Sequence, residues 1–252
     1  MPVTAAVKPY SLYLYRMLPF VSLVTPTYNR RRFIPSLIRS MEQQTYPKDR
    51  MEWIIYDDGQ EPVGDLFEQA KAIIPNIRYV YSEEKLSLGE KRNKLNELAR
   101  GEILVAIDDD DFYFPERVMT AVMALKNRPS VDLAGSSEVY MYFTDTQEIY
   151  KIGPYFKKHA TNGTMVWRKR YALSRQYDEA VAFAEEKSFL EGYKNDLVQL
   201  DPMKVMLVMC HSDNTFDKTA LRTTDNPMIK KTSMKLKDFI KDPVLRDFYA
   251  TA

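Results

Sequence analysis

Short apolar segments alternate with longer amphipathic segments through the first half of the chain. The apolar segments are rich in β-branched or aromatic residues and end at turn-forming residues, which is typical of buried strands. They cover residues 20–25, 53–56, 77–81 and 103–107. The amphipathic segments have apolar residues at helical spacing and cover residues 33–44, 65–74 and 89–99. Such regular alternation predicts an α/β fold, a Rossmann-like three-layer α/β/α sandwich around a mainly parallel central sheet.

The second half of the chain is less regular. Here we expect helices over residues 117–126, 168–175 and 185–193, and strands over residues 131–134, 138–143, 150–152, 164–167 and 205–209. The strands at 138–143 and 150–152 are spaced as a hairpin. We assign residues 1–222 to one domain, which begins with an arm over residues 1–18. Residues 223–252 are polar and lysine-rich, and we expect a C-terminal helical extension with an amphipathic helix from Met234 to Ile240.

Composition and charge narrow the functional classes. Lys plus Arg is 36 and Asp plus Glu is 35, whereas nucleic-acid binders carry a basic excess or stripe, so we expect no nucleic-acid partner. The single cysteine, Cys210, excludes an internal disulfide and suits a reducing compartment. The segment Tyr10–Val24 is interrupted by Arg16 and Pro19 and is too short and too polar to cross a membrane. We expect a soluble, cytoplasmic protein, and the lysines of the extension are compatible with peripheral contact to a membrane surface.

Polar clusters follow three of the predicted strands. They are the loop Thr27–Arg30, the turn Asp57–Gly59 and the four consecutive aspartates Asp108–Asp111. Because the carboxyl ends of parallel strands meet at one edge of a sheet, we expect these clusters to share a crevice. Carboxylates packed so closely need a cation, and Mg²⁺ or Mn²⁺ with phosphate oxygens would satisfy them. A solvated acidic loop that caps the next helix is the alternative interpretation of the aspartates.

The ordered set of motifs resembles the family-2 type of inverting glycosyltransferase, which has the GT-A fold. The resemblance covers about residues 19–215, and its motifs are PTYNR (26–30), QQTYP (43–47), DDG (57–59), GEKRN (89–93), ARGEI (99–103) and DDDD (108–111). It implies a nucleotide-sugar donor, most often UDP-linked, and a divalent metal, Mn²⁺ or Mg²⁺, on the diphosphate. It also implies an acceptor hydroxyl on a glycan or another molecule. No G-x-G-x-x-G or P-loop motif occurs.

The resemblance assigns donor-binding roles to individual residues. Thr27 and Tyr28 would line the nucleotide pocket, and Asp57 would bind the base. Asp108 and Asp109 would lie near the ribose.

The metal and diphosphate residues follow from the same resemblance. Asp110 would be the metal aspartate of the D-x-D motif, although the run of four aspartates allows the motif to begin at Asp108 or Asp109. His211, which follows a predicted strand, would be a further metal ligand, and a lone histidine is otherwise more often structural. Arg92 would face the diphosphate, whereas Lys91 reads equally well as a solvated helix charge.

The catalytic base is expected in an acidic pair at the start of a helix. Inverting transfer needs a base that deprotonates the acceptor hydroxyl as it attacks the anomeric carbon. The family places this base at the second acidic position, here Glu186 rather than Glu185, although many members have Asp there. An acidic pair at a helix start is also ordinary helix-dipole chemistry.

Two other functions remain as alternatives. A sugar nucleotidyltransferase would be expected to carry a Gly-rich, Arg-containing loop after the first strand, and PTYNR contains no glycine. A non-catalytic glycan-binding protein of the same fold is the second alternative. Substituting Glu186 by Gln separates the classes, because an enzyme would lose transfer while still binding nucleotide.

Overall fold

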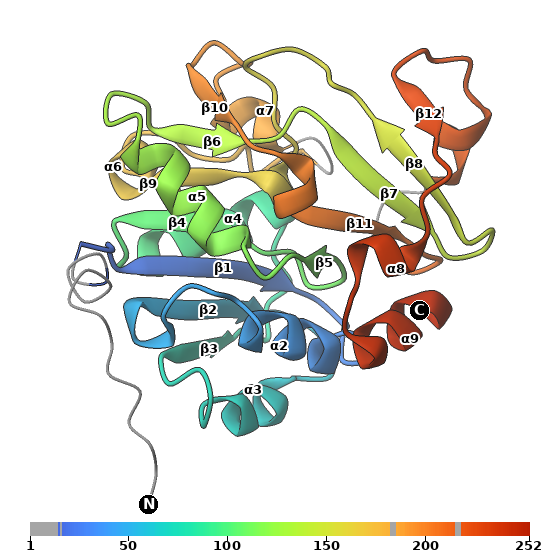
Figure 1. Cartoon of the computed structure of the whole chain (residues 1–252). Helices are drawn as coiled ribbons and strands as arrows, with labels where there is room; N and C mark the ends of the chain where they lie inside the picture. The colour runs from blue at the N-terminus through green and yellow to red at the C-terminus, as the bar shows by residue number, and fades with distance from the viewer. Residues whose placement is uncertain (1–14, 16, 182–184, 215–217) are drawn as a thin grey trace, which may run out of the picture.

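The predicted strands of the first half lie side by side in one seven-stranded sheet (Figure 1). The structure is a computed structural model, and it describes residues 15, 17–181, 185–214 and 218–252. The strand order is β10-β6-β9-β4-β1-β2-β3. These strands are β1 (Val21–Thr27), β2 (Met51–Asp57), β3 (Ile77–Tyr81), β4 (Ile103–Ala106), β6 (Leu133–Gly135), β9 (Val166–Arg168) and β10 (Leu197–Gln199). Only β9 is antiparallel to its neighbours within this described sheet, so the predicted, mainly parallel central sheet is confirmed.

Helices cover both faces of this sheet. One face carries α2 (Ile34–Glu42), α3 (Gly64–Ala70) and α5 (Arg117–Lys126), and the other carries α4 (Leu88–Leu98), α6 (Lys169–Ala172) and α7 (Glu186–Phe189). Successive strand residues point to opposite faces. Trp53 of β2 therefore packs edge-on against Phe67 of α3, with ring centroids 5.2 Å apart. Ile54 instead joins Leu95 of α4 in the other apolar cluster. The predicted α/β/α sandwich is confirmed.

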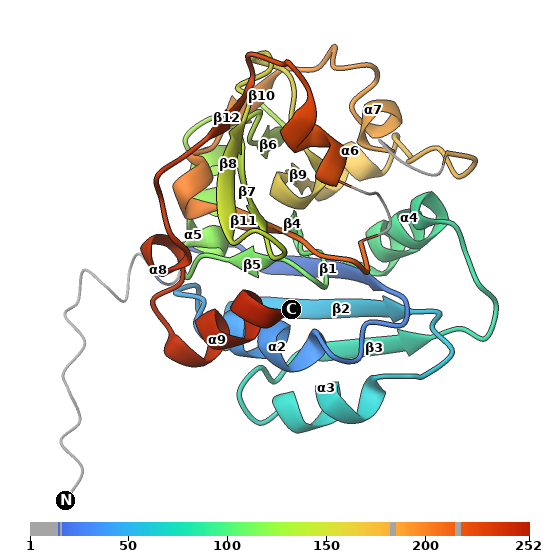
Figure 2. The same cartoon turned by 90° about the vertical axis from the view of Figure 1, so that its right-hand side faces the viewer.

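A second, five-stranded sheet is built mainly from the less regular half of the chain. Its strand order is β12-β8-β7-β11-β5. These strands are β5 (Phe112–Tyr113), β7 (Val139–Phe143), β8 (Glu148–Ile152), β11 (Met206–Cys210) and β12 (Ile229–Lys231). Strands β7 and β8 form the predicted antiparallel hairpin. Helices α8 (Leu236–Phe239) and α9 (Pro243–Thr251) lie near this sheet (Figure 2). Their buried apolar residues share one cluster with residues of β5, β7, β8 and β11.

Polar contacts hold the C-terminal segment against the rest of the structure. The Asp242 carboxylate caps α9 by accepting hydrogen bonds from the backbone N–H groups of Val244 at 2.9 Å and Leu245 at 3.2 Å. It also accepts from Arg39 Nε at 2.9 Å and Gln43 Nε2 at 2.5 Å, both on or next to α2. Helix α9 is thereby joined to α2, and the segment from β12 to α9 is integrated with the two sheets.

Several element boundaries differ from the predictions. Strand β1 continues through Pro26, which we expected to end it, because β4 pairs with β1 only as far as Val24 and a residue without an N–H is tolerated there. The segment Met234–Ile240 contains only the single turn α8, and α9 was not predicted although Asp242-Pro243 is a helix-start signal. Strands β5, β10 and β12 were also not predicted. Short 3-10 turns span Lys48–Arg50, Asn162–Thr164, Pro202–Lys204 and Thr219–Thr223.

The predicted N-terminal arm lies outside the described residues, except for residues 15, 17 and 18. In the part of the chain that the structure does describe, no helix has both the length and the apolar character needed to cross a membrane.

Candidate active site

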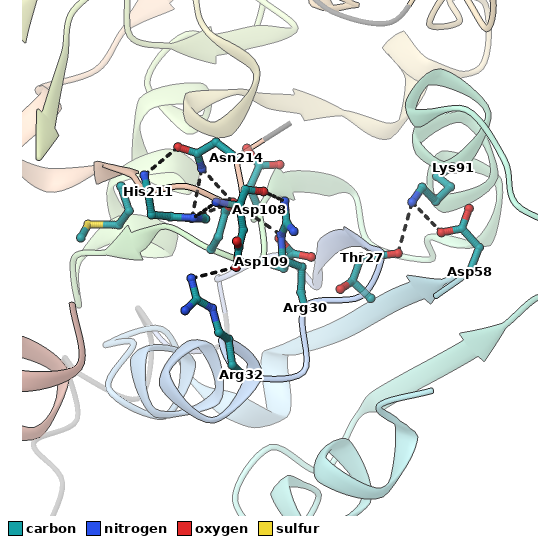
Figure 3. A network of polar contacts seen from close by, with 12 residues as sticks. Thr27, Arg30, Arg32, Asp58, Lys91, Asp108, Asp109, His211 and Asn214 are labelled. Atoms are coloured by element: carbon teal, nitrogen blue, oxygen red, sulfur yellow. Dashed lines mark hydrogen bonds and ion pairs between the residues drawn. The ribbon is translucent and has the colours of Figure 1, made fainter. Parts of the chain in front are cut away.

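The polar ends of β1, β2 and β4 lie together at one edge of the central sheet (Figure 3). Lys91 Nζ, from α4, donates to Asp58 Oδ1 at 2.7 Å and to the carbonyl oxygen of Thr27 at 3.2 Å. Lys91 and Asp58 are both buried, so the interpretation of Lys91 as a solvated helix charge is wrong. The buried ion pair instead joins α4 to the ends of β1 and β2, where an open α/β sheet binds its ligands.

The consecutive aspartates take different partners. Asp108 Oδ1 accepts from Arg92 Nη2 at 3.1 Å. Asp109 Oδ1 lies 3.8 Å from Arg30 Nε. Asp111 Oδ1 accepts a backbone N–H of β11 at 2.8 Å and is buried. The first three carboxylates therefore lie next to Arg92, Arg30 and His211, whereas the fourth anchors β11. The alternative of a solvated acidic loop does not describe this arrangement.

Burial and repulsion between neighbouring carboxylates disfavour the ionised forms of these aspartates. Burial, with the neighbouring Asp110, raises the pKa of Asp109 to about 8. Burial likewise raises the pKa of Asp111 well above its ordinary value. Burial disfavours the charged form of Asp110 too, but the hydrogen bond from His211 and the charge of Lys218 bring its pKa below the usual value. Carboxylates this close ionise together only where positive charge is supplied.

Asp110 and His211 are the predicted metal ligands, and the structure brings them together. His211 Nε2 lies 3.3 Å from Asp110 Oδ2, and Asn214 Nδ2 donates to the same oxygen at 3.2 Å. One carboxylate and one imidazole form a donor set that suits Mn²⁺. Among the residues that the structure describes, no group of three or more His, Cys, Asp or Glu side chains is arranged to hold a metal ion. Two protein ligands leave the other coordination positions for phosphate oxygens and water.

Both ring nitrogens of His211 have polar neighbours. The backbone N–H of Asp213 lies 3.2 Å from Nδ1, and Asn214 Nδ2 lies 3.0 Å from Nε2. Nε2 is the nitrogen that faces Asp110 Oδ2. A divalent cation bound by both residues would therefore use Nε2 and Oδ2.

Helix α4 organises the site through the motif GEKRN. A capping box at Ser87 fixes its first turn. A Cβ on Gly89 would lie 2.4 Å from the carbonyl oxygen of Asp178, so only glycine lets the segment at Asp178 approach this closely. Asn93 then clamps that segment, because its side chain donates to the Tyr177 carbonyl at 3.0 Å and accepts the Tyr177 N–H at 2.8 Å. The motif thus holds residues that are more than 80 positions away in the chain.

Arg92 connects the two acidic motifs. Its Nε donates to Glu185 Oε1 at 2.9 Å while its Nη2 donates to Asp108. With its amide oriented to satisfy its neighbours, Asn162 accepts from Arg92 Nη1 at 2.7 Å and donates to the Tyr177 hydroxyl at 2.9 Å. Burial works against the charge of Arg92, but Asp108 and Glu185 raise its pKa above the ordinary value. Arg92 is therefore a buried, permanently charged link between the end of β4 and the start of α7.

The two glutamates of the acidic pair are in different environments. Glu185 is buried and paired with Arg92. Glu186 begins α7 and, unlike Glu185, forms no ion pair within the described residues. Burial, followed by repulsion from Glu185, raises the pKa of Glu186 to about 7. A carboxyl poised near neutral pH is suited to proton transfer, whereas an ion-paired carboxylate is suited to holding structure.

The turn after β2 presents its two aspartates to opposite sides. Asp57 accepts the Tyr79 hydroxyl at 2.5 Å and two backbone N–H groups of the following loop, at 2.8 and 3.1 Å. This arrangement gives Asp57 a structural role, and its predicted contact with the base stays a prediction. Asp58 faces α4 instead. Tyr28 lies beside this turn, with Lys85 Nζ 4.2 Å from its ring centroid, so a cation already covers part of the predicted nucleotide pocket.

Comparison with known proteins identifies the family. The model of the family described as Glycosyl transferase family 2 matches residues 22–187. The chain belongs to this family. It is 27% identical over 202 residues to an uncharacterised glycosyltransferase of Methanocaldococcus jannaschii, covering 72% of this chain and 68% of that protein. It is 28% identical over 126 residues to the glycosyltransferase AglE of Haloferax volcanii, covering 50% of this chain and 41% of that protein.

Solved structures of glycosyltransferases share the fold. One is TarS of S. aureus in complex with UDP-GlcNAc, with a TM-score of 0.63, 18% identity and coverage of 77% of this chain and 60% of that chain. Another is the mannosyltransferase PcManGT of Pyrobaculum calidifontis in complex with GDP-Man and Mn²⁺, with a TM-score of 0.61, 16% identity and coverage of 80% and 60%. The predicted family and GT-A fold are confirmed. This chain spans only part of the length of each of these proteins.

Several residues of this family-2 site had no role in the sequence analysis. They are Arg30, Asn93, Asn162 and Asn214. Arg30 and Asn93 lie within motifs that carry the resemblance, so their positions were a usable signal. The two other asparagines are isolated amides in the irregular half, and no spacing or periodicity distinguishes them.

Proposed function

We propose that the chain is a metal-dependent, inverting glycosyltransferase that moves a sugar from a nucleoside diphosphate to a hydroxyl of a glycan or another acceptor. The observation that carries this proposal is the double ion pair of Arg92, at 2.9 Å to Glu185 and 3.1 Å to Asp108. Glu186 adjoins Glu185 in the chain, so this link supports a base held close to the carboxylates of the proposed donor site. Inverting transfer needs that juxtaposition, because the hydroxyl that the base deprotonates attacks the anomeric carbon from the face opposite the leaving nucleotide.

The donor would lie along the ends of β1, β2 and β4. Thr27, Tyr28 and the turn at Asp57–Asp58 would surround the base, and Asp108 and Asp109 would contact the ribose. Asp110 and His211 would hold a divalent cation, Mn²⁺ or Mg²⁺, which when bound supplies positive charge for the diphosphate. Residues 1–222 would form the transferase domain, with residues 223–252 as its extension.

On the acceptor side, Glu186 would take the proton of the attacking hydroxyl. Its pKa near 7 means that a large share is ionised at neutral pH while its basicity remains useful. Arg92 positions the reaction by holding Glu185, and so the start of α7, at a fixed distance from Asp108. No step requires Arg92 to gain or lose a proton, since both carboxylates keep it charged.

The donor is proposed to be a UDP-sugar. TarS, which shares the fold, is in complex with UDP-GlcNAc, whereas PcManGT is in complex with GDP-Man and Mn²⁺. These two proteins support a nucleotide-sugar donor and a metal, and the resemblance of the motifs favours UDP. We place the activity in the cytoplasm, because a chain with one cysteine suits a reducing compartment.

Calorimetric titration of UDP, GDP, dTDP and CDP, with and without Mn²⁺, tests the proposal. We expect metal-dependent binding of UDP that Asp110→Ala abolishes. Asp145→Ala is the matched control, since Asp145 is an exposed carboxylate paired with Arg222. If none of the nucleotides binds under either condition, the transferase function is wrong.

A further inference from the structure

A cluster of four aromatic rings lies beyond the acidic residues, on the acceptor side of the site. It consists of Tyr155, Phe156, His159 and Tyr193, which we call the aromatic cluster. The His159 ring is central: it stacks on Tyr193 at 5.0 Å and 27°, and lies 4.6 Å from Tyr155 and 5.4 Å from Phe156. Phe156 also meets Tyr193 edge-on at 5.3 Å. The mechanism proposed above uses none of these rings.

The aromatic cluster is open to solvent although it is large and apolar. Phe156 is 50% exposed and Tyr155 is 39% exposed. Exposed aromatic side chains gathered in one place usually mark a binding site rather than a solvated surface. The cluster also contains an unsatisfied polar atom: among the described residues, the buried His159 Nδ1 has no hydrogen-bond partner. Burial lowers the pKa of His159, so the ring is neutral and can give or take a hydrogen bond.

The loop that carries three of the rings is held in place. Gln199 Nε2 donates to the carbonyl oxygens of Lys157 and His159, both at 2.9 Å. Lys158 Nζ donates to the Lys194 carbonyl at 2.8 Å. The loop therefore keeps one shape against the segment that follows α7, and its rings form a preorganised surface.

Backbone hydrogen bonds connect the aromatic cluster to the helix of the proposed base. The N–H of Leu190 donates to the Glu186 carbonyl at 2.8 Å, and the N–H of Tyr193 donates to the Leu190 carbonyl at 2.9 Å. Burial together with the Glu186 charge raises the pKa of Tyr193, so the carboxylate acts on this ring. His159 lies three residues before Asn162, which contacts Arg92.

We propose that the aromatic cluster binds a pyranose ring of the acceptor, so that the acceptor of this chain is a carbohydrate. A pyranose has faces of C–H groups and a rim of hydroxyls. Ligand sites of this kind combine aromatic walls with a few polar groups that fix orientation. Tyr155 and Phe156 supply the wall, the hydroxyls of Tyr155 and Tyr193 supply polar groups, and Glu186 would receive the proton of the attacking hydroxyl. This inference rests on the proposed function for the role of Glu186.

Saturation-transfer NMR on the full chain tests the proposal without an acceptor assay. The probes are the methyl glycosides and short oligomers of glucose, galactose, mannose and N-acetylglucosamine, with UDP and Mn²⁺ present. We expect the ring protons of at least one probe to receive saturation. Phe156→Ala and Tyr155→Ala should each weaken that binding by roughly three- to tenfold, as expected for losing one aromatic contact. Phe156→Trp should retain it.

Ile73→Ala is the matched control, because Ile73 has the same 50% exposure as Phe156 but belongs to the region after α3. It should change nothing. The calorimetric UDP titration is run on every variant, and we expect it to be unaffected by changes in the aromatic cluster.

The outcomes separate the two proposals. If UDP binds but no glycoside does, or if the ring variants bind glycosides as well as the wild type, the acceptor role of the aromatic cluster is wrong and the transferase proposal stands. If a glycoside binds at the rings but no nucleotide binds at all, the aromatic cluster is a sugar site and the transferase proposal is wrong. If Phe156→Ala only changes the oligomeric state in sedimentation, the surface belongs to a second copy of the chain and the inference fails.

Discussion

The proposed donor side and the proposed acceptor side of this site differ in chemistry. On the proposed donor side, charges are matched with opposite charges, as between Lys91 and Asp58 or Arg30 and Asp109. On the proposed acceptor side, aromatic rings gather in one cluster. A nucleoside diphosphate is highly charged, and a sugar acceptor is not. The difference between the two sides matches the difference in charge between the two molecules that they are proposed to bind.

Arg92 is the point where the two sides meet. Its guanidinium pairs with one carboxylate from each side, and the three groups are largely buried. A buried charge with its partner removed is strongly destabilising. The two sides are therefore joined by a contact on which both the fold and the geometry of the site depend. Substitutions on one side, or at Arg92 itself, should therefore have different effects on activity, nucleotide binding and stability.

The largest effect is expected from removing the proposed base. Glu186→Gln should reduce transfer by about 10²–10⁴-fold, the usual contribution of a general base. It should leave UDP binding unchanged, because Glu186 is on the acceptor side. Steady-state kinetics and calorimetry measure the two quantities. The control is Glu191→Gln, a nearby glutamate paired with Arg175. If Glu191→Gln causes the same loss, or if only Glu185→Gln abolishes transfer, the base is wrongly assigned.

The next largest effect is expected on stability, when the ion pairs of Arg92 are removed. Arg92→Met leaves Glu185 and Asp108 without their cation and should lower the free energy of unfolding by about 3–5 kcal/mol. Denaturant unfolding measures this change. Arg175→Met removes an exposed partner of Glu191 and should have little effect. Equal stabilities of the two variants would show that the ion pairs of Arg92 do not stabilise the fold.

A third prediction concerns pH. Burial and Glu185 raise the pKa of Glu186 from 4.5 to about 7, so kcat/KM should rise with pH and level off above about pH 7. Below that pH it should fall roughly tenfold per unit, because the base is protonated. If kcat/KM instead falls only near pH 4.5, the ordinary pKa of a glutamate, the raised pKa of Glu186 is wrong.

The same shift has a consequence for stability. The folded state holds the proton of Glu186 more tightly than the unfolded state, so this stabilisation is complete below about pH 4.5 and is lost as the pH rises through about 7. Glu186→Gln should therefore melt at a higher temperature than the wild type above pH 7, and at a similar temperature well below it. Thermal unfolding at the two pH values measures the difference.

The smallest effect is expected at the C-terminal segment, away from both sides. Asp242→Ala removes the cap of α9 and the contacts with Arg39 and Gln43. It should lower the free energy of unfolding by about 1–2 kcal/mol, which is roughly 2–8 °C in melting temperature for a chain of this size. Asp242→Asn keeps the cap and loses the charge, so its free energy of unfolding should lie between those of the wild type and Asp242→Ala. UDP binding should persist in both variants.

Much of the donor side could be predicted from the sequence because its signals are local. Buried strands, turn residues at their ends and the run Asp108–Asp111 are visible within a few positions, and a parallel sheet brings strand ends together. The GEKRN motif was equally visible, but the partners of Lys91, Arg92 and Asn93 were not. Each contacts a residue that lies 33 to 93 positions away. No local pattern encodes such pairings.

The sequence by itself determined the fold class, the family, and the order in which strands and helices follow one another along the first half of the chain. Periodicity, turn chemistry and ordered motifs are properties of the chain alone. Tertiary structure decided which side each carboxylate faces. Asp57 and Asp58 are adjacent, yet one bonds to Tyr79 of β3 and the other to Lys91 of α4, because β2 ends at Asp57 and Asp58 begins the turn that follows. It also decided that Glu185, and not Glu186, would pair with Arg92, and that four rings from two distant segments would meet. Such outcomes depend on packing between elements, which a linear pattern does not specify.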